Sequence, residues 1–193
     1  MKIRRFLLAG LAVTGVALPV AALALVKPLR VAVPALMPGI TCTSAAICID
    51  DVSRLSAAEQ LYKDGSAVAS KAVGQFRHAP RMVFCATSQC ADTFGMGTRA
   101  AEAVGDIGLV VAPRGWTTFY VAHELIHHRQ AEELGNLALL TKPKWLIEGM
   151  AYSLSEDPRR PLGGPLEQWR SQFDAWRATR GTGDFWEMVR EVD

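Results

Sequence analysis

A single long apolar stretch divides this chain into two parts that obey different physical constraints. Residues 6–26 run for 21 positions without a charged side chain, which is long enough to cross a bilayer as a helix. Lys2, Arg4 and Arg5 precede the stretch, and such positive charge holds the N-terminus on the cytoplasmic side of a membrane. The rest of the chain is therefore expected to fold outside the cytoplasm.

The apolar stretch allows two interpretations. In the first, all of residues 6–26 stays in place as a membrane anchor, because the stretch is longer than the apolar core of an ordinary signal peptide. In the second, Pro19 ends a shorter signal sequence, and Ala22 and Ala24 provide the small residues of a cleavage site. We favour an extracytoplasmic protein anchored by residues 6–26, with a secreted or periplasmic protein, cleaved near Ala24, as the alternative.

The remaining residues have the composition of one globular domain. Half of the 193 residues are hydrophobic, which supports a packed core. Lysine and arginine number 21 against 19 acidic residues, and without the three N-terminal cations the balance is 18 to 19. A nearly neutral body without a basic stripe argues against a nucleic-acid partner. We expect the domain over residues 50–193, preceded by an extended linker over residues 27–49 that is rich in proline and glycine.

The four cysteines fit an extracytoplasmic location. An even number of cysteines in an exported chain predicts disulfide bonds. The short separations favour the pairs Cys42–Cys48 and Cys85–Cys90 over crossed pairings. The same separations are less typical of a zinc site built from cysteines.

The spacing of apolar residues predicts a mixed α+β body. Short runs of β-prone residues cover residues 81–85 and 107–112. Apolar residues at helical spacing predict one helix over residues 54–75, or two helices separated at Gly65, with Ser53 as the N-cap. Further helices are predicted over residues 117–134, 144–155 and 166–179, and a short one after Asp184.

The strongest chemical signal is the sequence His123-Glu124-Leu125-Ile126-His127, which lies within the predicted helix over residues 117–134. Side chains four positions apart lie on one face of a helix, about 6 Å from each other. Both imidazoles can therefore bind the same metal ion. Glu124 follows the first histidine and can take a proton from a water molecule at that metal. We predict His123 and His127 as Zn²⁺ ligands and Glu124 as the catalytic base.

Glu148 is the best candidate for the third protein ligand that a catalytic zinc ion needs. It is the only charged residue within residues 145–152, where apolar residues surround it on all sides of the predicted helix. A helix that is apolar all round is buried, and a buried carboxylate is costly unless a cation pairs with it. Zinc would be that cation. The small residues Gly149 and Ala151 are expected to let this helix approach the histidine helix closely.

Other roles stay open from the sequence. Asp184 is a weaker alternative for the third ligand, because it lies far from the histidines along the chain. Peptide hydrolysis also needs a donor that stabilises the oxyanion. The candidates for that donor are Tyr152, Tyr120, His128 and Arg114.

The motif HExxH, followed by a helix of the form W-L-x-E-G-x-A at residues 145–151, resembles the gluzincin metallopeptidases, and specifically the peptidase MA-like domains. The resemblance covers residues 105–157. It implies a zincin-like single domain of the α+β class, with a small sheet, an active-site helix and a downstream glutamate helix, preceded here by one N-terminal hydrophobic helix. It also implies that the two histidines and the glutamate named above bind Zn²⁺ and that Glu124 is the general base.

Two details of the family pattern bear on the cleft. In such folds an edge strand lines the cleft, and the resemblance assigns this position to residues 107–112. Some gluzincins carry an aspartate four residues after the glutamate ligand, which orients the first histidine. This chain has Tyr152 at that position, so the residue that orients His123 stays open.

These observations predict an exported, membrane-anchored zinc peptidase that hydrolyses peptide or protein substrates through a metal-activated water. The alternative is an extracytoplasmic domain that binds zinc and acts as a binding or chaperone-like protein without turnover. A third interpretation is a structural protein without metal. The sequence leaves the cleavage specificity and the oligomeric state open.

Overall fold

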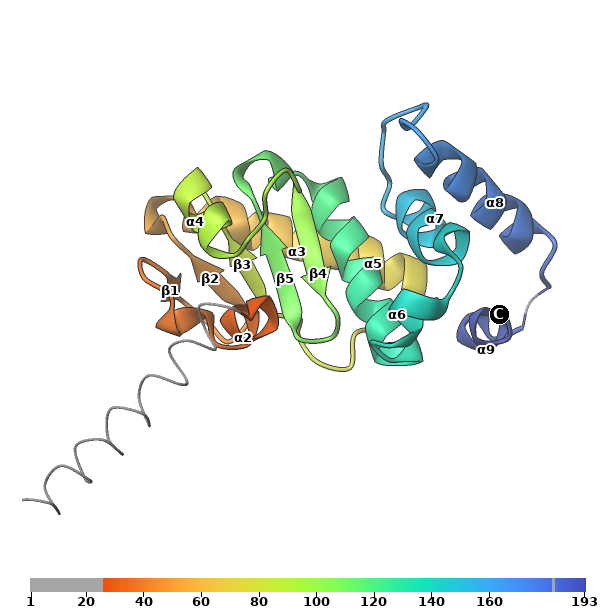
Figure 1. The fold of residues 1–193 in the computed structure, drawn as a ribbon, viewed down its shortest axis with the longest axis horizontal. Coiled ribbons are helices and arrows are strands. Elements are labelled where there is room, and N and C mark those ends of the chain that lie inside the picture. The colour runs from red at the N-terminus through yellow and green to blue at the C-terminus, as the bar shows by residue number, and fades with distance from the viewer. Residues whose placement is uncertain (1–25, 182) are drawn as a thin grey trace, which may run out of the picture.

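The chain folds around a small mixed β-sheet with helices on both of its faces (Figure 1). The computed structural model describes residues 26–181 and 183–193. Its strands are β1 (Thr41–Cys42), β2 (Ile47–Ile49), β3 (Met82–Phe84), β4 (Ala101–Val104) and β5 (Gly108–Val111). Its α-helices are α2 (Lys27–Ala32), α3 (Leu55–Val73), α4 (Ser88–Thr93), α5 (Thr118–Leu134), α6 (Ala138–Thr141), α7 (Lys144–Leu154), α8 (Leu166–Ala178) and α9 (Phe185–Arg190), and the 3-10 helices are η1 (Pro34–Leu36), η2 (Val52–Arg54) and η3 (Pro113–Gly115).

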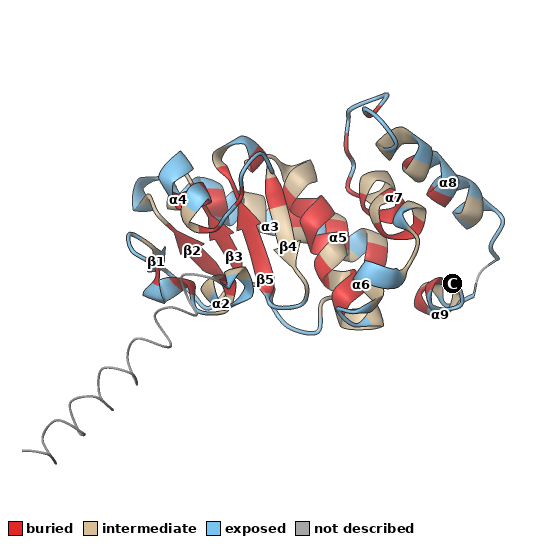
Figure 2. Cartoon of the chain, in the orientation of Figure 1, coloured by how far each residue is buried: buried red, intermediate tan, exposed pale blue. Residues whose placement is uncertain are grey.

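The strand order β1-β2-β3-β5-β4 explains how both faces of the sheet become buried. The three central strands β2, β3 and β5 run parallel, and the two outer strands are antiparallel to their neighbours. Successive side chains of a strand point to opposite faces. One row, Ile49–Phe84–Val111, contributes to the core under α3 and α5. The adjacent row, Cys48–Val83–Val110, contributes to a second core under α2 and α4 (Figure 2). The α+β class with one small sheet is thus confirmed.

The contact between α3 and α5 depends on a glycine. A Cβ atom at Gly65 would lie 2.5 Å from the Val121 side chain, so only glycine permits this approach of the two helices. Of the two alternatives, the single helix is present, because α3 continues through Gly65 as one helix of 19 residues. The helix is preceded by η2, where Asp51 rather than Ser53 is the N-cap, and its side chain accepts a hydrogen bond from the Ser53 amide.

Gly149 has a different packing partner from the one that the sequence predicted. A Cβ atom at this position would lie 2.3 Å from the carbonyl oxygen of Trp169 in α8. The absence of a side chain therefore lets α7 approach α8 rather than α5. Phe173 of α8 is fully buried next to the same glycine, so α8 supports α7 from the side away from the histidine helix (Figure 1).

Residues 27–49, expected to form an extended linker, are part of the folded body. They form α2, η1, β1 and β2, and β2 is buried in the sheet. Val31 of α2 is fully buried in the second core. Two of the prolines that suggested a linker, Pro28 and Pro34, lie instead at the first turns of α2 and η1, where a missing amide proton costs no hydrogen bond.

The edge strand also differs from the expectation. Residues 107–112 contain β5, but β5 lies inside the sheet between β3 and β4. The edge strand next to β5 is β4, which pairs with β5 in antiparallel register. Its sequence, AEAV, carries no run of β-branched residues and gave no strand signal.

The other local predictions are confirmed. The disulfides Cys42–Cys48 and Cys85–Cys90 are present. The predicted elements over residues 81–85, 117–134, 144–155 and 166–179 correspond to β3, α5, α7 and α8. Asp184 caps α9 by accepting a hydrogen bond from the Glu187 amide.

The N-terminal hydrophobic helix predicted over residues 6–26 lies outside the described residues, apart from Val26. Within residues 26–181 and 183–193, no helix is both long and apolar enough to cross a bilayer.

Candidate metal centre

Helix α5 carries the two histidines of the motif on one face. The helix follows directly from the central strand β5 through η3, and it ends at Gly135, whose φ of 84° is favourable for glycine. His123 and His127 are one turn apart, and their Nε2 atoms lie 3.1 Å from each other. Two nitrogens this close, on side chains that are mostly shielded from solvent, can be two ligands of one metal ion.

Helix α7 brings Glu148 to the same point. One carboxylate oxygen of Glu148 lies 3.5 Å from Nε2 of His127 and 3.8 Å from Nε2 of His123. One ligand atom from each residue lies within 4.8 Å of the others, so one cation could contact all three. The structure thus brings together the three residues that the sequence predicted as ligands. We call His123, His127 and Glu148 the metal cluster.

The electrostatics of the metal cluster are those of a partly buried carboxylate beside two imidazoles. Burial by itself lowers the pKa of His127, but the Glu148 carboxylate and the charge of Glu124 outweigh burial and raise the pKa to about 9. Burial also opposes the ionisation of Glu148, whereas hydrogen bonding with the two histidines holds its pKa far below the usual range. The carboxylate is therefore ionised at neutral pH and attracts positive charge.

Gln130 orients the second histidine and was not predicted from the sequence. Its Oε1 lies 2.8 Å from Nδ1 of His127, and its Nε2 donates to the Ile147 carbonyl at 2.9 Å. The residue is completely buried. Because the amide oxygen accepts, the neutral His127 ring carries its proton on Nδ1, and Nε2 then has a lone pair toward the metal cluster. One side chain thus joins α5 to α7 beside Glu148; the only sequence signal is a glutamine at a buried helical position.

Glu124 lies beside the metal cluster and is held by the edge strand. Its Oε2 accepts a hydrogen bond of 2.7 Å from the backbone amide of Ala103 in β4. The residue is almost fully buried. It lines the same cavity of about 320 Å³ as all three residues of the metal cluster. The predicted base is therefore positioned next to the predicted metal site.

The cavity is a cleft between β4 and α7, with α5 as its floor. Arg99 and Ala101 contribute from the β4 side, Lys144 from the start of α7, and Leu139 from α6. A second hollow of about 190 Å³ shares residues of β4 and α5 with the first and is also lined by Tyr120. The two hollows adjoin, because both are lined by Arg99, Ala101, His123, Glu124 and Tyr152.

The candidate oxyanion donors fall into two groups. Tyr152 lines both hollows, and its ring meets the His123 ring edge-on at a centroid distance of 4.4 Å. Burial, together with the charge of Glu148, raises the pKa of Tyr152 to about 12, so its hydroxyl keeps its proton. Tyr120 lines the second hollow and accepts a hydrogen bond from Arg159.

The remaining candidates do not reach the cleft. Arg114 donates to the carbonyl oxygens of Arg99 and Gly97. His128 lies on another side of α5, where its Nδ1 donates to the Gly105 carbonyl at 3.2 Å. Asp184, the weaker ligand candidate, is used as the cap of α9.

His128 belongs to a second set of buried charged residues on α5, which we call the structural cluster: His128, Arg129 and Glu132. The Glu132 carboxylate accepts from Arg129 at 2.8 Å and from the Arg77 amide at 3.0 and 3.2 Å. Nε2 of His128 lies 3.7 Å from the same carboxylate. Burial lowers the pKa of His128, which favours the neutral ring. The negative charge of Glu132 is therefore compensated by protein groups alone.

Comparison with family models, with curated proteins and with solved structures found no match to this chain. The likeness to gluzincin metallopeptidases rests on the motif and on the order of the elements that carry it. The geometry described above is therefore the main support for a function.

Proposed function

We propose that this chain is a zinc-dependent peptidase whose active site is the cleft between β4, α5 and α7. The observation that supports this most is the convergence of His123, His127 and Glu148 from two helices onto one point, next to Glu124. Two imidazole nitrogens and one carboxylate are a ligand set typical of catalytic zinc, which keeps one position open for water or substrate.

The residues present fit a zinc ion. Gln130 fixes the tautomer of His127 so that Nε2 faces the cluster. Glu148 is ionised and supplies negative charge that the two imidazoles do not cancel when they are neutral. When bound there, zinc would supply Lewis acidity, which lowers the pKa of water toward 7 and polarises a carbonyl group.

Glu124 is the group that moves protons in this proposal. Its Oε2 stays hydrogen-bonded to the Ala103 amide, so the carboxylate holds one orientation while Oε1 takes a proton from the attacking water. The same carboxylic acid then gives the proton to the leaving amine, as general acid–base catalysis requires. Tyr152, which stays protonated and lines the same cavity, would donate to the oxyanion.

An extended peptide can add to the free edge of β4. The amide of Ala103 points away from β5, because it donates to Glu124. Backbone groups alternate in direction along a strand, so the amide and carbonyl of Ala101 and the carbonyl of Ala103 point to the cleft as well. These groups can pair with a substrate backbone and hold a peptide bond over the metal cluster. Recognition through the backbone suits a peptide or protein substrate.

We further propose that the domain works outside the cytoplasm and is anchored by residues 6–26. Two disulfides support an oxidising compartment. The uncharged stretch preceded by three cations supports the anchor.

The test is an assay of the full-length, zinc-loaded protein on a fluorogenic peptide library. We expect cleavage that a zinc chelator abolishes and that added Zn²⁺ restores. A protein that holds one zinc ion per chain but cleaves no member of the library would contradict the peptidase proposal and favour a zinc-containing binding or chaperone-like domain.

A further inference from the structure

The exposed apolar side chains of the molecule gather at one edge of the sheet. It is formed by the ends of the strands at which β2, β3 and β5 begin, and it differs from the side edge formed by strand β4. We call it the lower edge because it lies at the bottom of Figure 1. It is formed by α2 with η1, the loop over residues 74–81, the turn over residues 105–107, and α6. Of the large apolar side chains that are exposed in the described part of the chain, Val52 alone belongs to other segments. The rest are Val26, Leu29, Val33, Leu36, Ile107, Leu137 and Leu140.

Specific contacts hold these segments in place at the lower edge. Arg81, which precedes β3, donates to the carbonyl of Ala45 at 3.2 Å and also to the carbonyl of Ala32 at the end of α2. Asn136, next to α6, exchanges hydrogen bonds with Asp106 in the turn, at 2.9 and 3.2 Å. The apolar side chains therefore project from a fixed surface. Leu137 and Leu140 are the most exposed, at 73% and 79%. Apolar side chains gathered at one edge in this way mark a binding surface.

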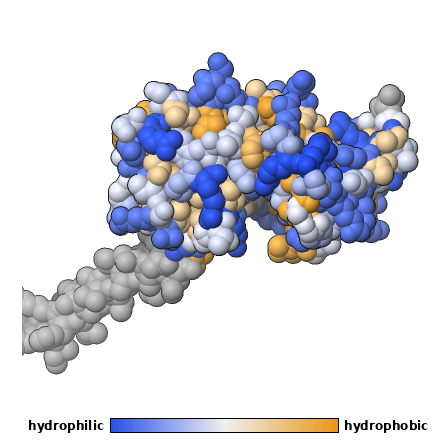
Figure 3. Space-filling model, turned by 90° about the horizontal axis from the view of Figure 1, so that it is seen from above, coloured by the Kyte–Doolittle hydropathy of each residue, from blue (hydrophilic) through white to orange (hydrophobic). Residues whose placement is uncertain are grey.

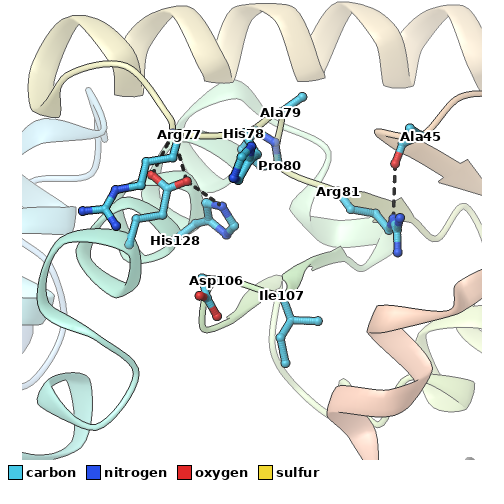
Figure 4. A pocket seen from close by; sticks show the side chains of 10 residues that line it. Ala45, Arg77, His78, Ala79, Pro80, Arg81, Asp106, Ile107 and His128 are labelled. Atoms are coloured by element: carbon cyan, nitrogen blue, oxygen red, sulfur yellow. Dashed lines mark hydrogen bonds and ion pairs between the residues drawn. The ribbon is translucent and has the colours of Figure 1, made fainter.

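A hollow of about 440 Å³ at the same edge carries positive charge (Figure 4). Arg77, His78 and Arg81 line it, and Arg77 is more than half exposed. Of the two carboxylates in its wall, Glu132 is paired with Arg129, whereas Asp106 is hydrogen-bonded only to the neutral Asn136 and keeps its charge. Arg81 donates only to backbone carbonyls in the bonds described above, so its charge is not cancelled there. Counted together, Arg77, Arg81, Arg129 and Arg190 exceed Glu132, Glu133 and Asp106 by one positive charge, which gives the hollow a small preference for an anion.

The junction between residues 6–26 and α2 indicates what lies against the lower edge. The uncharged residues 6–26 end where α2 begins, with no linker between them. Helix α2 is fixed to the body, since Val31 is fully buried and Lys27 forms an ion pair with Glu102 of β4. A bilayer that holds residues 6–26 must therefore lie against the surface that carries α2. The face seen from above in Figure 3, on the other side of the molecule, carries mostly hydrophilic and neutral residues with small separate apolar patches.

We propose that the lower edge rests on a lipid bilayer, with its leucines among the lipid chains and with anionic headgroups over the hollow of Arg77, His78 and Arg81. Apolar side chains next to basic ones are the pattern of surfaces that bind at the membrane interface. This inference uses the anchor of the proposed function, but it concerns a surface that plays no part in the metal cluster.

The orientation has a consequence for the substrate, which rests on the proposed function. Strand β4 ends at Val104, next to the turn at the lower edge, and its four residues span about 13 Å. Leu139 of α6 lines the metal cleft while its neighbours Leu137 and Leu140 are exposed at the lower edge. A peptide added to β4 would thus run out of the bilayer and pass the metal cluster within the first few residues. The substrate class is the extracytoplasmic juxtamembrane segment of a membrane protein.

The contact with lipid can be measured on the full chain in nanodiscs. An environment-sensitive fluorescent amino acid is placed at Leu140 or Leu36, and at Gln89 or Gln168 as controls, which are exposed positions on α4 and α8 away from the lower edge. With lipids spin-labelled near the headgroup, we expect quenching at the two leucine positions to be several times stronger than at the two glutamines. A bilayer with anionic lipid should increase this difference over a zwitterionic one. Equal quenching at all four positions would overturn the proposal.

A second arm tests the substrate class. The variant Leu137→Asp/Leu140→Asp, in the full chain, should cleave a peptide tethered close to the bilayer several times more slowly than the unchanged protein, and a soluble peptide at the same rate. An equal effect on both peptides, or none on either, would contradict the substrate class. If the unchanged protein cleaves neither peptide, the peptidase proposal fails, and the quenching result still decides whether the lower edge contacts lipid.

Discussion

His123 and His127 of the metal cluster lie within ten residues of the structural cluster on α5, and Glu148 joins them from α7, yet the charges of the two clusters are compensated in different ways. In the structural cluster, Glu132 receives hydrogen bonds from Arg129 and from a backbone amide, so protein groups cancel its charge. In the metal cluster, Glu148 meets only two imidazoles, which carry positive charge only if they take up protons. A buried carboxylate needs a cation. The first cluster contains a permanent cation in Arg129, whereas the second contains one only while His127 is protonated, and a metal ion can take the place of that proton.

The difference comes from the neighbours of each face of the helix. His128 points to the β4–β5 turn and donates to Gly105, which closes that side. His123 and His127 point to the cleft, where the edge strand β4 and the helix α7 leave a cavity between them. Histidine and glutamate therefore stabilise the fold on the face of α5 that meets the β4–β5 turn. On the face that meets the cleft they take part, in our proposal, in catalysis. Variants of each cluster separate these two roles.

The largest effect is expected for Glu124→Gln. The amide keeps an oxygen that can accept from Ala103, so the fold and zinc content should stay unchanged, but no proton can be taken. Peptide hydrolysis should fall by about 10²- to 10⁴-fold. The assay is kcat/KM on the best peptide of the library, with Glu59→Gln, an exposed residue of α3, as the control. Activity within a few fold of the unchanged protein would remove Glu124 from the base role.

Gln130→Met should weaken the metal cluster without touching a ligand. The variant keeps the volume of the buried side chain but loses the acceptor for Nδ1 of His127 and the donor for the Ile147 carbonyl. Loss of such a supporting hydrogen bond raises the Kd for a metal about 10- to 100-fold. The Kd for Zn²⁺ is measured by competition with a chromophoric chelator, with Gln60→Met on the exposed face of α3 as the control. An unchanged Kd would show that Gln130 only packs.

Glu132→Gln should lower the free energy of unfolding and leave the zinc content unchanged. Arg129 and the Arg77 amide lose a charged acceptor in a buried setting, which costs about 1–3 kcal/mol of unfolding free energy. Chemical denaturation in the presence of a chelator gives this value, and metal analysis of the untreated protein gives the zinc content. If the zinc content falls as well, the two clusters are not independent.

The smallest expected effect is on the number of protons that are released when zinc binds. In the metal-free protein the pKa of His127 is raised to about 9, so its ring is protonated at neutral pH, and zinc binds only the neutral ring. Zinc binding near pH 7 should therefore release a proton from His127, and this release should vanish as the pH rises through about 9. Calorimetric titrations in two buffers of different ionisation enthalpy measure the proton count. Glu132→Gln, in the structural cluster, should leave the number of released protons unchanged. A number of released protons that does not change with pH would argue against His127 as a ligand.

The parts of the molecule that the sequence predicted are those with local signals. Helix α5 has apolar residues at helical spacing, a threonine before its start and a glycine after its end. The HExxH motif needs only helical geometry to place His123 and His127 together. Glu148 could be identified because an isolated charge in an apolar helix needs a partner.

The parts that the sequence did not predict depend on contacts between distant segments. Strand β4 has only four residues, one of them Glu102, and it is a strand because β5 offers a partner. Strand β2 lies within a proline-rich segment and is stabilised by its pairing with β3. Gln130 and Gly149 are ordinary residues in the sequence, and their roles arise only when α7 meets α5 and α8.

The most direct test is the zinc content of the purified full-length protein after dialysis against a weak chelator. The convergence of His123, His127 and Glu148 predicts about one zinc ion per chain, with nitrogen and oxygen ligands at about 2.0–2.2 Å by X-ray absorption. Glu148→Ala should reduce the zinc content to nearly zero, while the Glu59→Gln control keeps it. A protein without zinc, or a zinc content that Glu148→Ala leaves unchanged, would contradict the account.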